Sequence, residues 1–166
     1  GEIRDGELIA SMALPGAAVT VVVALVSLVL GGAMADAGPL RDPAVRAAWL
    51  VERIAELERV KAAAAAEQAY AAVLLDRARR EDEAATGVPR RRQGVGVATE
   101  IALARQDSPA RGGRHLGFAK ALVNEMPHTL AALECGALNE WRASILVRET
   151  AYLAVEDRQK IDVEMC

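Results

Sequence analysis

Apolar and polar residues repeat with a helical period over the central part of the chain. From Ala44 to Ala85 there is no glycine or proline, and one set of positions recurs in steps of four and three. This heptad-like stripe consists of Leu50, Ile54, Leu57, Lys61, Ala64, Gln68, Ala71, Leu75 and Ala78. Such spacing places one side of a helix against a partner helix. We therefore expect one long helix over residues 42–85.

Capping signals mark both ends of this long helix. Asp42 followed by Pro43 provides an N-cap and a proline at the first helical position, and Gly87 provides a C-cap. Asp76 and Arg80 stand four residues apart and are expected to pair on the exposed side. Two interpretations of the stripe stay open. One is an ordinary scaffold helix, and the other is a dimerisation helix that makes a homo-oligomer.

The remainder of the chain is divided by glycine and proline into shorter helices. One ends at about Glu125, the next begins at Pro127 and stops at Gly136, a third is capped by Asn139, and the last begins near Glu156. The third is expected to supply three core residues: Trp141, Ile145 and Leu146. No stretch alternates with period two over the length of a strand. The pattern predicts an all-α fold of one long helix packed with several short ones.

Two of the short helices are expected to form a helix-turn-helix-like unit at about residues 97–123. An apolar helical pattern around Ile101 ends at a polar break. Ser108 follows as a helix N-cap, and Pro109 stands where the first helical turn tolerates proline. Two helices joined by a short turn, with basic side chains on the second, are the layout of a helix-turn-helix.

The second helix of this unit combines basic side chains with two adjacent glycines. We expect Arg111, Arg114 and His115 to face outward and Leu116 to face the core. The glycines at 112–113 each cost on the order of 1 kcal/mol of helix stability relative to alanine. This helix is therefore expected to fray, or to open as a loop before His115. The alternative to a recognition helix is a plain core-packing pair.

Positive charge is concentrated in one segment of an otherwise acidic chain. The net charge is −3, yet residues 90–120 contain seven Lys or Arg and two Asp or Glu, a local balance of +5. Charge asymmetry of this kind is typical of proteins that bind an anionic partner, and arginine binds phosphate in bidentate fashion. The candidate DNA-binding residues are Arg90, Arg91, Arg92, Arg105, Arg111, Arg114, His115 and Lys120. For the triple arginine, a solvated loop is the alternative.

The N-terminal region is strongly apolar, with no charged residue between positions 8 and 35. About twenty apolar residues can span a bilayer, and Ala33-Met34-Ala35 has the form of a signal-peptidase site. Acidic residues precede the run, which argues against a signal peptide. Three interpretations stay open: a buried helix that starts near Pro15 and is capped by Gly31, a membrane segment at 17–35, and a signal segment.

Two divisions of the chain follow from these patterns. Residues 1–41 form an apolar N-terminal segment, and residues 42–166 form a helical domain. Because the last helical pattern still continues at Cys166, we expect that domain to be truncated at its C-terminal end. The expected location is cytoplasmic, with membrane anchoring through residues 17–35 as the alternative.

Residues that carry chemistry are sparse. His115 and His128 are the two histidines, and Cys135 and Cys166 are the two cysteines. Neither pair has the spacing or number of ligands of a metal site, and no serine stands in a nucleophile elbow. The sequence thus gives no catalytic residue, metal or cofactor. We expect the cysteines to be reduced thiols of an intracellular chain.

Several sequence blocks together resemble a known family. They are Gly87-Val88-Pro89, Gly94-Val95-Gly96-Val97-Ala98, the segments 108–112 and 122–133, Glu140-Trp141-Arg142 and Arg148-Glu149-Thr150-Ala151. The chain from about residue 45 to residue 166 resembles the actinobacterial thirteen-E-twelve repeat proteins. In that family, a helical domain of unknown function precedes an HNH endonuclease domain.

The resemblance implies a cytoplasmic, DNA-associated protein linked to mobile elements. It does not imply nuclease activity for these 166 residues, because an HNH motif needs a ββα unit rich in cysteine and histidine. We expect any such unit to lie beyond Cys166. The predicted function is a non-catalytic helical DNA-associated module of an HNH-endonuclease-like protein. The alternatives are an oligomerisation or protein-interaction scaffold, and a protein tethered to a membrane through residues 17–35.

Overall fold

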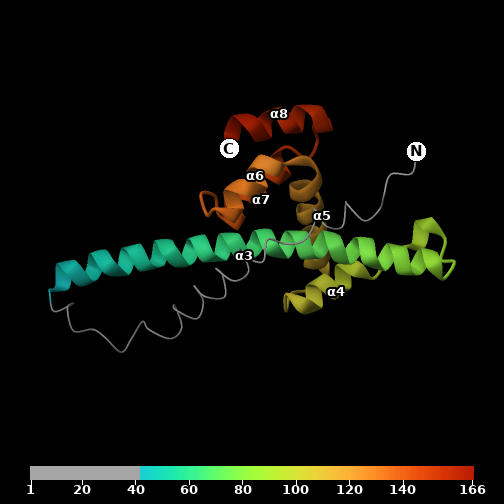
Figure 1. Ribbon diagram of the computed structural model, residues 1–166, viewed down its shortest axis with the longest axis horizontal. Coiled ribbons are helices and arrows are strands. Elements are labelled where there is room, and N and C mark those ends of the chain that lie inside the picture. Colours follow the sequence, from blue (N-terminus) through green and yellow to red (C-terminus); the bar gives the residue numbers. More distant parts are fainter. Residues whose placement is uncertain (1–41) are drawn as a thin grey trace, which may run out of the picture. The chain divides into compact units, whose positions relative to one another are not determined.

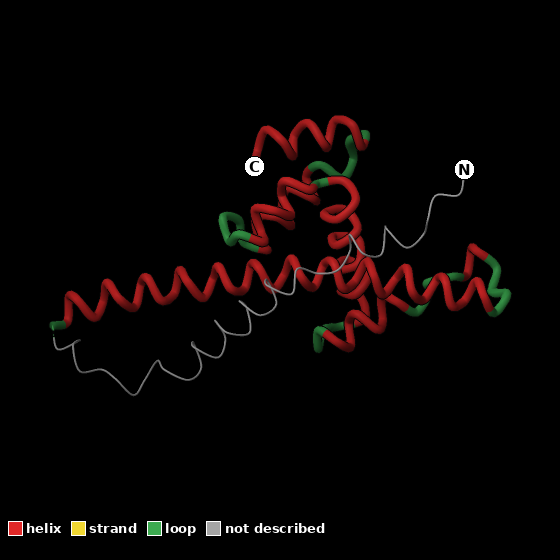
Figure 2. Tube along the Cα trace, in the orientation of Figure 1, coloured by secondary structure: helices red, strands yellow, loops and turns green. Residues whose placement is uncertain are grey.

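The computed structural model describes residues 42–166, and the regular structure in this range is helical (Figures 1 and 2). Its elements are α3 (Pro43–Ala85), a 3-10 helix η1 (Arg90–Arg92), α4 (Val97–Ala104), α5 (Pro109–Glu125), α6 (Pro127–Glu134), α7 (Glu140–Glu149) and α8 (Val155–Met165). The predicted all-α fold with a long helix is confirmed. Residues 56–166 form one compact unit. The predicted buried helix, signal site and membrane segment lie outside the described residues.

Both ends of α3 are formed by the predicted caps. The Ala44 N–H donates to the Asp42 carboxylate at 2.8 Å, which satisfies a backbone donor of the first turn. At the other end Gly87 has φ +81°, and the Val88 N–H donates to the Glu83 carbonyl at 2.8 Å. This is the Schellman arrangement, in which a left-handed glycine ends the helix.

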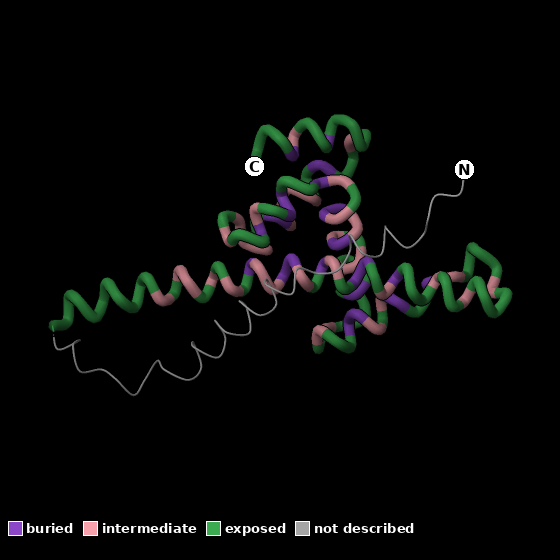
Figure 3. Tube along the Cα trace, viewed as in Figure 1, coloured by how far each residue is buried: buried purple, intermediate pink, exposed green. Residues whose placement is uncertain are grey.

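The side of α3 that packs in the folded chain differs from the predicted stripe. Leu50, Ile54 and Leu57 are exposed. Figure 3 shows exposed positions along the first half of α3 and buried ones in its second half. The buried side is rich in alanine: Ala62, Ala65, Ala66, Ala69, Ala72, Val73 and Asp76. Lys61 and Gln68 interrupt the leucine stripe, whereas alanine lets neighbouring helices approach closely, so the alanine side makes the core.

The predicted ion pair between Asp76 and Arg80 on α3 is confirmed, but Asp76 does not lie on an exposed face. Its carboxylate is buried and lies 2.9 Å from Arg80 Nε and 2.7 Å from Nζ of Lys120 on α5. Burial opposes ionisation of Asp76, but the hydrogen bonds from Arg80 and Lys120 outweigh it and hold its pKa below the usual value. This carboxylate therefore fastens α5 to α3 rather than supporting a solvated helix face.

Helices α5 and α6 supply the larger residues of the core, and α7 contributes a small one. Leu122, Leu130 and Leu133 are buried against the alanine side of α3. The predicted stop and cap are both confirmed: Gly136 has φ +73°, and Asn139 accepts a hydrogen bond from the Arg142 N–H at 2.9 Å. Trp141 was expected in the core, but 69% of it is exposed. Ala143, two residues further along α7, takes the buried position instead.

Helix α8 is held to the other helices by two buried ionic side chains. The Asp162 carboxylate accepts hydrogen bonds from the N–H groups of His128 and Thr129 at the start of α6, both at 2.8 Å. Arg158 forms an ion pair with Glu125 of α5 and donates to the Val147 carbonyl of α7 at 2.7 Å. Each contact joins residues far apart in the sequence, so α8 closes the bundle through tertiary contacts.

Candidate nucleic-acid interface

Helices α4 and α5 form the predicted pair of short helices joined by a tight turn. Four residues, 105–108, connect them, and Gln106 adopts φ +55°. That backbone region favours glycine, and asparagine tolerates it better than other residues do. The Asp107 N–H donates to the Ala102 carbonyl at 2.8 Å, so the turn is closed by the backbone of α4. The turn has the left-handed residue of a helix-turn-helix, with glutamine in place of glycine.

Gly112 allows the backbones of α4 and α5 to meet. A Cβ atom at this position would lie 1.9 Å from the Ala98 carbonyl oxygen and 3.0 Å from the Ala102 Cβ. At Gly113 a Cβ atom would meet nothing within 4 Å. The prediction of fraying is wrong, because α5 is continuous across both glycines. The close approach at Gly112 offsets the low helix propensity that suggested fraying.

Ser108 is the N-cap residue of α5, as predicted, but it does not cap the helix through its side chain. Ser108 has the extended backbone of an N-cap, and Pro109 follows at the start of the helix, but the Ser108 side chain makes no capping hydrogen bond. Its backbone N–H donates instead to Oδ1 of Asp107 at 2.9 Å. The Asp107 carboxylate therefore orders the entry into α5.

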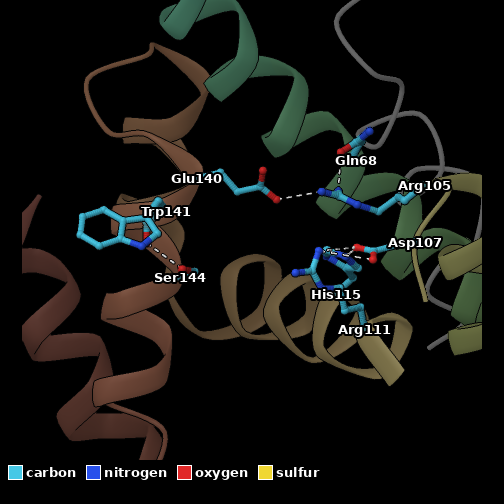
Figure 4. Close-up of polar contacts among 8 residues, drawn as sticks. All are labelled: Gln68, Arg105, Asp107, Arg111, His115, Glu140, Trp141 and Ser144. Carbon is cyan, nitrogen blue, oxygen red and sulfur yellow. Dashed lines mark hydrogen bonds and ion pairs between the residues drawn. The ribbon is translucent and has the colours of Figure 1, made fainter. Parts of the chain in front are cut away.

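Two of the predicted DNA-binding cations are held by acidic side chains of the same chain. Arg105, at the end of α4, lies 2.9 Å from a Glu140 oxygen and also hydrogen-bonds Gln68 of α3 (Figure 4). Lys120 is the partner of the buried Asp76 described above. A phosphate would have to displace these carboxylates. Arg105 and Lys120 thus contribute mainly to packing between helices.

Asp107 contacts two basic side chains of α5. His115 Nε2 lies 3.0 Å from Oδ2, and Arg111 Nη1 lies 3.4 Å from each carboxylate oxygen (Figure 4). The hydrogen bond with His115, followed by the one from the Ser108 N–H, lowers the pKa of Asp107 to about 2. The carboxylate therefore stays ionised at neutral pH. His115, expected to face outward, is turned toward Asp107 and is only partly exposed.

The three arginines of η1 are arranged differently. Arg90, Arg91 and Arg92 are all exposed, and none of them has an ion-pair partner within residues 42–166. Their charges are consequently available to an external anion.

The backbone around η1 is fixed by contacts on its C-terminal side. The Gln93 side chain donates to the Val88 carbonyl at 2.8 Å, and the Gly94 N–H donates to the Glu83 carboxylate at 2.6 Å. Gly94 has φ +75°, and a Cβ atom there would lie 2.8 Å from the Arg80 guanidinium. The triple arginine thus sits on a solvent-exposed turn whose backbone is hydrogen-bonded to the end of α3.

Arg114 is the remaining predicted cation on α5. It is exposed, and no ion pair engages it in the described part of the chain. Arg111 is also exposed, but it leans on Asp107. The eight predicted residues therefore fall into two groups. Within residues 42–166, Arg90, Arg91, Arg92 and Arg114 have no ion-pair partner, whereas Arg105, Arg111, His115 and Lys120 each contact an acidic residue.

Asp107 is the residue whose role was not seen in the sequence. In the sequence it is only part of a polar break between two helices. The available signal was its spacing, since Arg111 and His115 follow it at four and eight residues and so lie on one side of a helix. Glu140 gave no comparable signal, because its partner Arg105 lies 35 residues away.

Metal ligands, a small hollow and the apolarity of the helices are the remaining features of the described residues that bear on function. No three His, Cys, Asp or Glu side chains within residues 42–166 lie close enough to hold a metal ion. A hollow of about 20 Å³ lies between α3, α4 and α5, next to Ala69, Ile101 and Phe118. This volume holds about one water molecule. Between residues 42 and 166, no helix has both the length and the apolarity required to cross a bilayer.

These features define a class: an all-α chain whose short helices are fastened to a long helix by ion pairs and which presents an ordered cationic turn. No family model, curated protein or solved structure matches the chain.

Proposed function

We propose that the chain is a non-catalytic helical module that binds DNA through its phosphates, within a cytoplasmic, HNH-endonuclease-like and mobile-element-linked protein. One observation carries the proposal: Arg90, Arg91 and Arg92 lie side by side in sequence on an ordered turn, all exposed and without an ion pair in the described residues. The resemblance to the thirteen-E-twelve repeat proteins supports the link to an HNH endonuclease.

Unpaired cations on a fixed backbone suit a polyanion for two reasons. Lys and Arg that reach phosphates release condensed counterions, and this release supplies most of the non-specific binding energy. A cation already bound to a carboxylate must first lose that partner. The turn at η1 also needs little ordering on binding, since its flanking residues are fixed by hydrogen bonds to Glu83 and Val88. We therefore place the principal contact at η1, with Arg114 as a second contact.

Replacing Arg90, Arg91 and Arg92 together by alanine is expected to weaken binding to a short mixed-sequence duplex roughly a hundredfold at low salt. Each contact with a phosphate is worth about 1 kcal/mol in water at 4 Å, and about 1.4 kcal/mol corresponds to a tenfold change in affinity. Fluorescence anisotropy of a labelled duplex measures the effect.

A matched variant removes the same charge elsewhere. Arg142, Arg148 and Lys160 are exposed on α7 and α8, so the variant R142A/R148A/K160A has the same net charge as the η1 variant. Its affinity for the duplex is expected to fall by less than about threefold, which is the effect of net charge alone at a distance. Equal losses in the two variants would contradict a localised contact at η1. No binding by the unaltered chain at low salt would reject the proposed function.

A second function, protein interaction or homo-oligomerisation, is favoured by an apolar surface on the first half of α3. Val45, Trp49, Leu50, Val51 and Ile54 are all exposed there, and exposed apolar patches mark interaction sites. Replacing Leu50 and Ile54 by glutamate is expected to leave a monomer if this side meets a second copy. Light scattering of the unaltered chain that gives a strict monomer would argue against this function. Membrane tethering through residues 17–35 stays a prediction.

A further inference from the structure

The Asp107 carboxylate lies at the entry to α5, beside two basic side chains of that helix. It is an oxyanion within contact distance of Arg111 and His115, two of the residues predicted to bind DNA (Figure 4). The Ser108 N–H holds the same carboxylate from the backbone side at 2.9 Å. Asp107 is therefore a fixed internal anion among basic groups.

The two basic partners of Asp107 are held very differently. The carboxylate is 21% exposed and lies 3.0 Å from His115, whose side chain is 22% exposed. The Arg111 side chain is 61% exposed, and its contacts with the carboxylate are 3.4 Å long. A long, exposed contact of this kind contributes little stability, whereas arginine binds phosphate strongly and in bidentate fashion. Arg111 can thus exchange the carboxylate for a phosphate, and His115 stays with Asp107.

We infer that Asp107 is an internal competitor of DNA phosphate, which holds Arg111 in the free protein and lowers the affinity of α5 for duplex DNA. This inference rests on the proposed function. It assigns to α5 a contact that forms only when a phosphate displaces the carboxylate. Arg114 carries no such restraint among the described residues, so α5 presents one freely available cation and one restrained cation.

Asparagine at position 107 tests the competition. Asp107→Asn keeps the shape and an oxygen that accepts from the Ser108 N–H, but it removes the charge. We expect the variant to bind a short mixed-sequence duplex about fivefold tighter than the unaltered chain at low salt, since one charge at contact distance is worth about that factor. The slope of log affinity against log salt should steepen by about one, because Arg111 adds a phosphate contact.

The role of Arg111 itself is tested by a double-mutant cycle. Arg111→Ala should weaken binding less than about twofold in the unaltered chain and about fivefold in the Asp107→Asn background. A purely structural Asp107 gives no such coupling, because its replacement would then leave the contribution of Arg111 unchanged. Arg114→Ala is the matched control and should weaken binding by the same factor in both backgrounds.

Each outcome of this cycle decides a separate claim. No DNA binding by the unaltered chain rejects the proposed function and the inference together. Binding that is weakened by the η1 substitutions but not tightened by Asp107→Asn overturns the inference alone. A tighter variant in which Arg111→Ala has the same effect as in the unaltered chain also overturns it. Circular dichroism would reveal whether Asp107→Asn unfolds. In that case, Arg111→Ala in the unaltered chain still decides the inference: a fall in duplex affinity above threefold contradicts it, and a fall below twofold supports it.

Discussion

Replacing Gly112 by alanine is expected to destabilise the chain by about 2–3 kcal/mol or to prevent folding. The new methyl group would lie 1.9 Å from the Ala98 carbonyl oxygen, so α4 and α5 would have to separate along their contact. Forcing an extra methylene into a packed interface typically costs about 1–3 kcal/mol, and a backbone carbonyl cannot turn aside as a side chain does. Urea unfolding followed by circular dichroism measures the free energy of unfolding.

The neighbouring glycine provides the control for this prediction. Gly113 lies on the same helix, and a Cβ atom there would meet nothing within 4 Å. Gly113→Ala should therefore stabilise the chain by about 0.5–1 kcal/mol, because alanine has the higher helix propensity. The two substitutions thus have opposite expected signs. Equal shifts for the two variants would contradict the close approach of α4 and α5 at Gly112.

Replacing Asp162 by alanine has the second large expected effect, a loss of about 2–4 kcal/mol. The carboxylate is fully buried and accepts hydrogen bonds from the His128 N–H and from both the N–H and the hydroxyl of Thr129. Removing a charged acceptor leaves these donors without their partner, the two on Thr129 being buried, and each such bond is worth about 1.5–3 kcal/mol without full additivity. Thermal and urea unfolding would both show the loss.

Asp157 on the same helix is the matched residue. It is exposed and pairs only with Lys160, at 2.8 Å, among the described residues. Asp157→Ala should cost less than about 1 kcal/mol, the range of surface ion pairs and of charges near a helix start. Asp162→Asn keeps one acceptor oxygen, so its loss of unfolding free energy should lie between those of Asp162→Ala and Asp157→Ala. A loss for Asp162→Ala no larger than that for Asp157→Ala would show that Asp162 does not cap α6.

Helix boundaries could be predicted from the sequence because their signals are local. Asp42, Gly87, Gly136 and Asn139 act on backbone groups within a few residues of themselves, and each functions in the structure as expected. Proline at 109 and 127 likewise begins α5 and α6. The all-α class followed from the same signals, together with the absence of a period-two pattern.

The choice of buried side was harder to predict, because it depends on what each helix meets. On α3 the leucines at 50 and 57 belong to the predicted heptad-like stripe, but the core is made by the alanines from 62 to 72. Small side chains give a weak pattern and yet allow the closest packing. Trp141 on α7 shows the same effect: this large apolar residue is exposed, while the small Ala143 is buried.

Partners of charged residues could be predicted least. The sequence located the basic segment but not the acidic residues that neutralise part of it. Asp76 lies 44 residues from Lys120, and Glu140 lies 35 from Arg105, so no local spacing reveals these pairs. Only the folded chain separates the cations that hold helices together from those at η1 and Arg114 that face solvent. Of the eight residues predicted to bind DNA, four thus have no ion-pair partner among the described residues.

The salt dependence of DNA affinity tests the central claim most directly. Log affinity of the unaltered chain for a duplex should fall linearly with log salt, with a slope of about −0.9 for each phosphate contacted. The three η1 arginines and Arg114 predict a slope of about −3 to −4, and the η1 triple-alanine variant should reduce its magnitude by about three. A slope near zero, or the same slope in both proteins, would contradict the account.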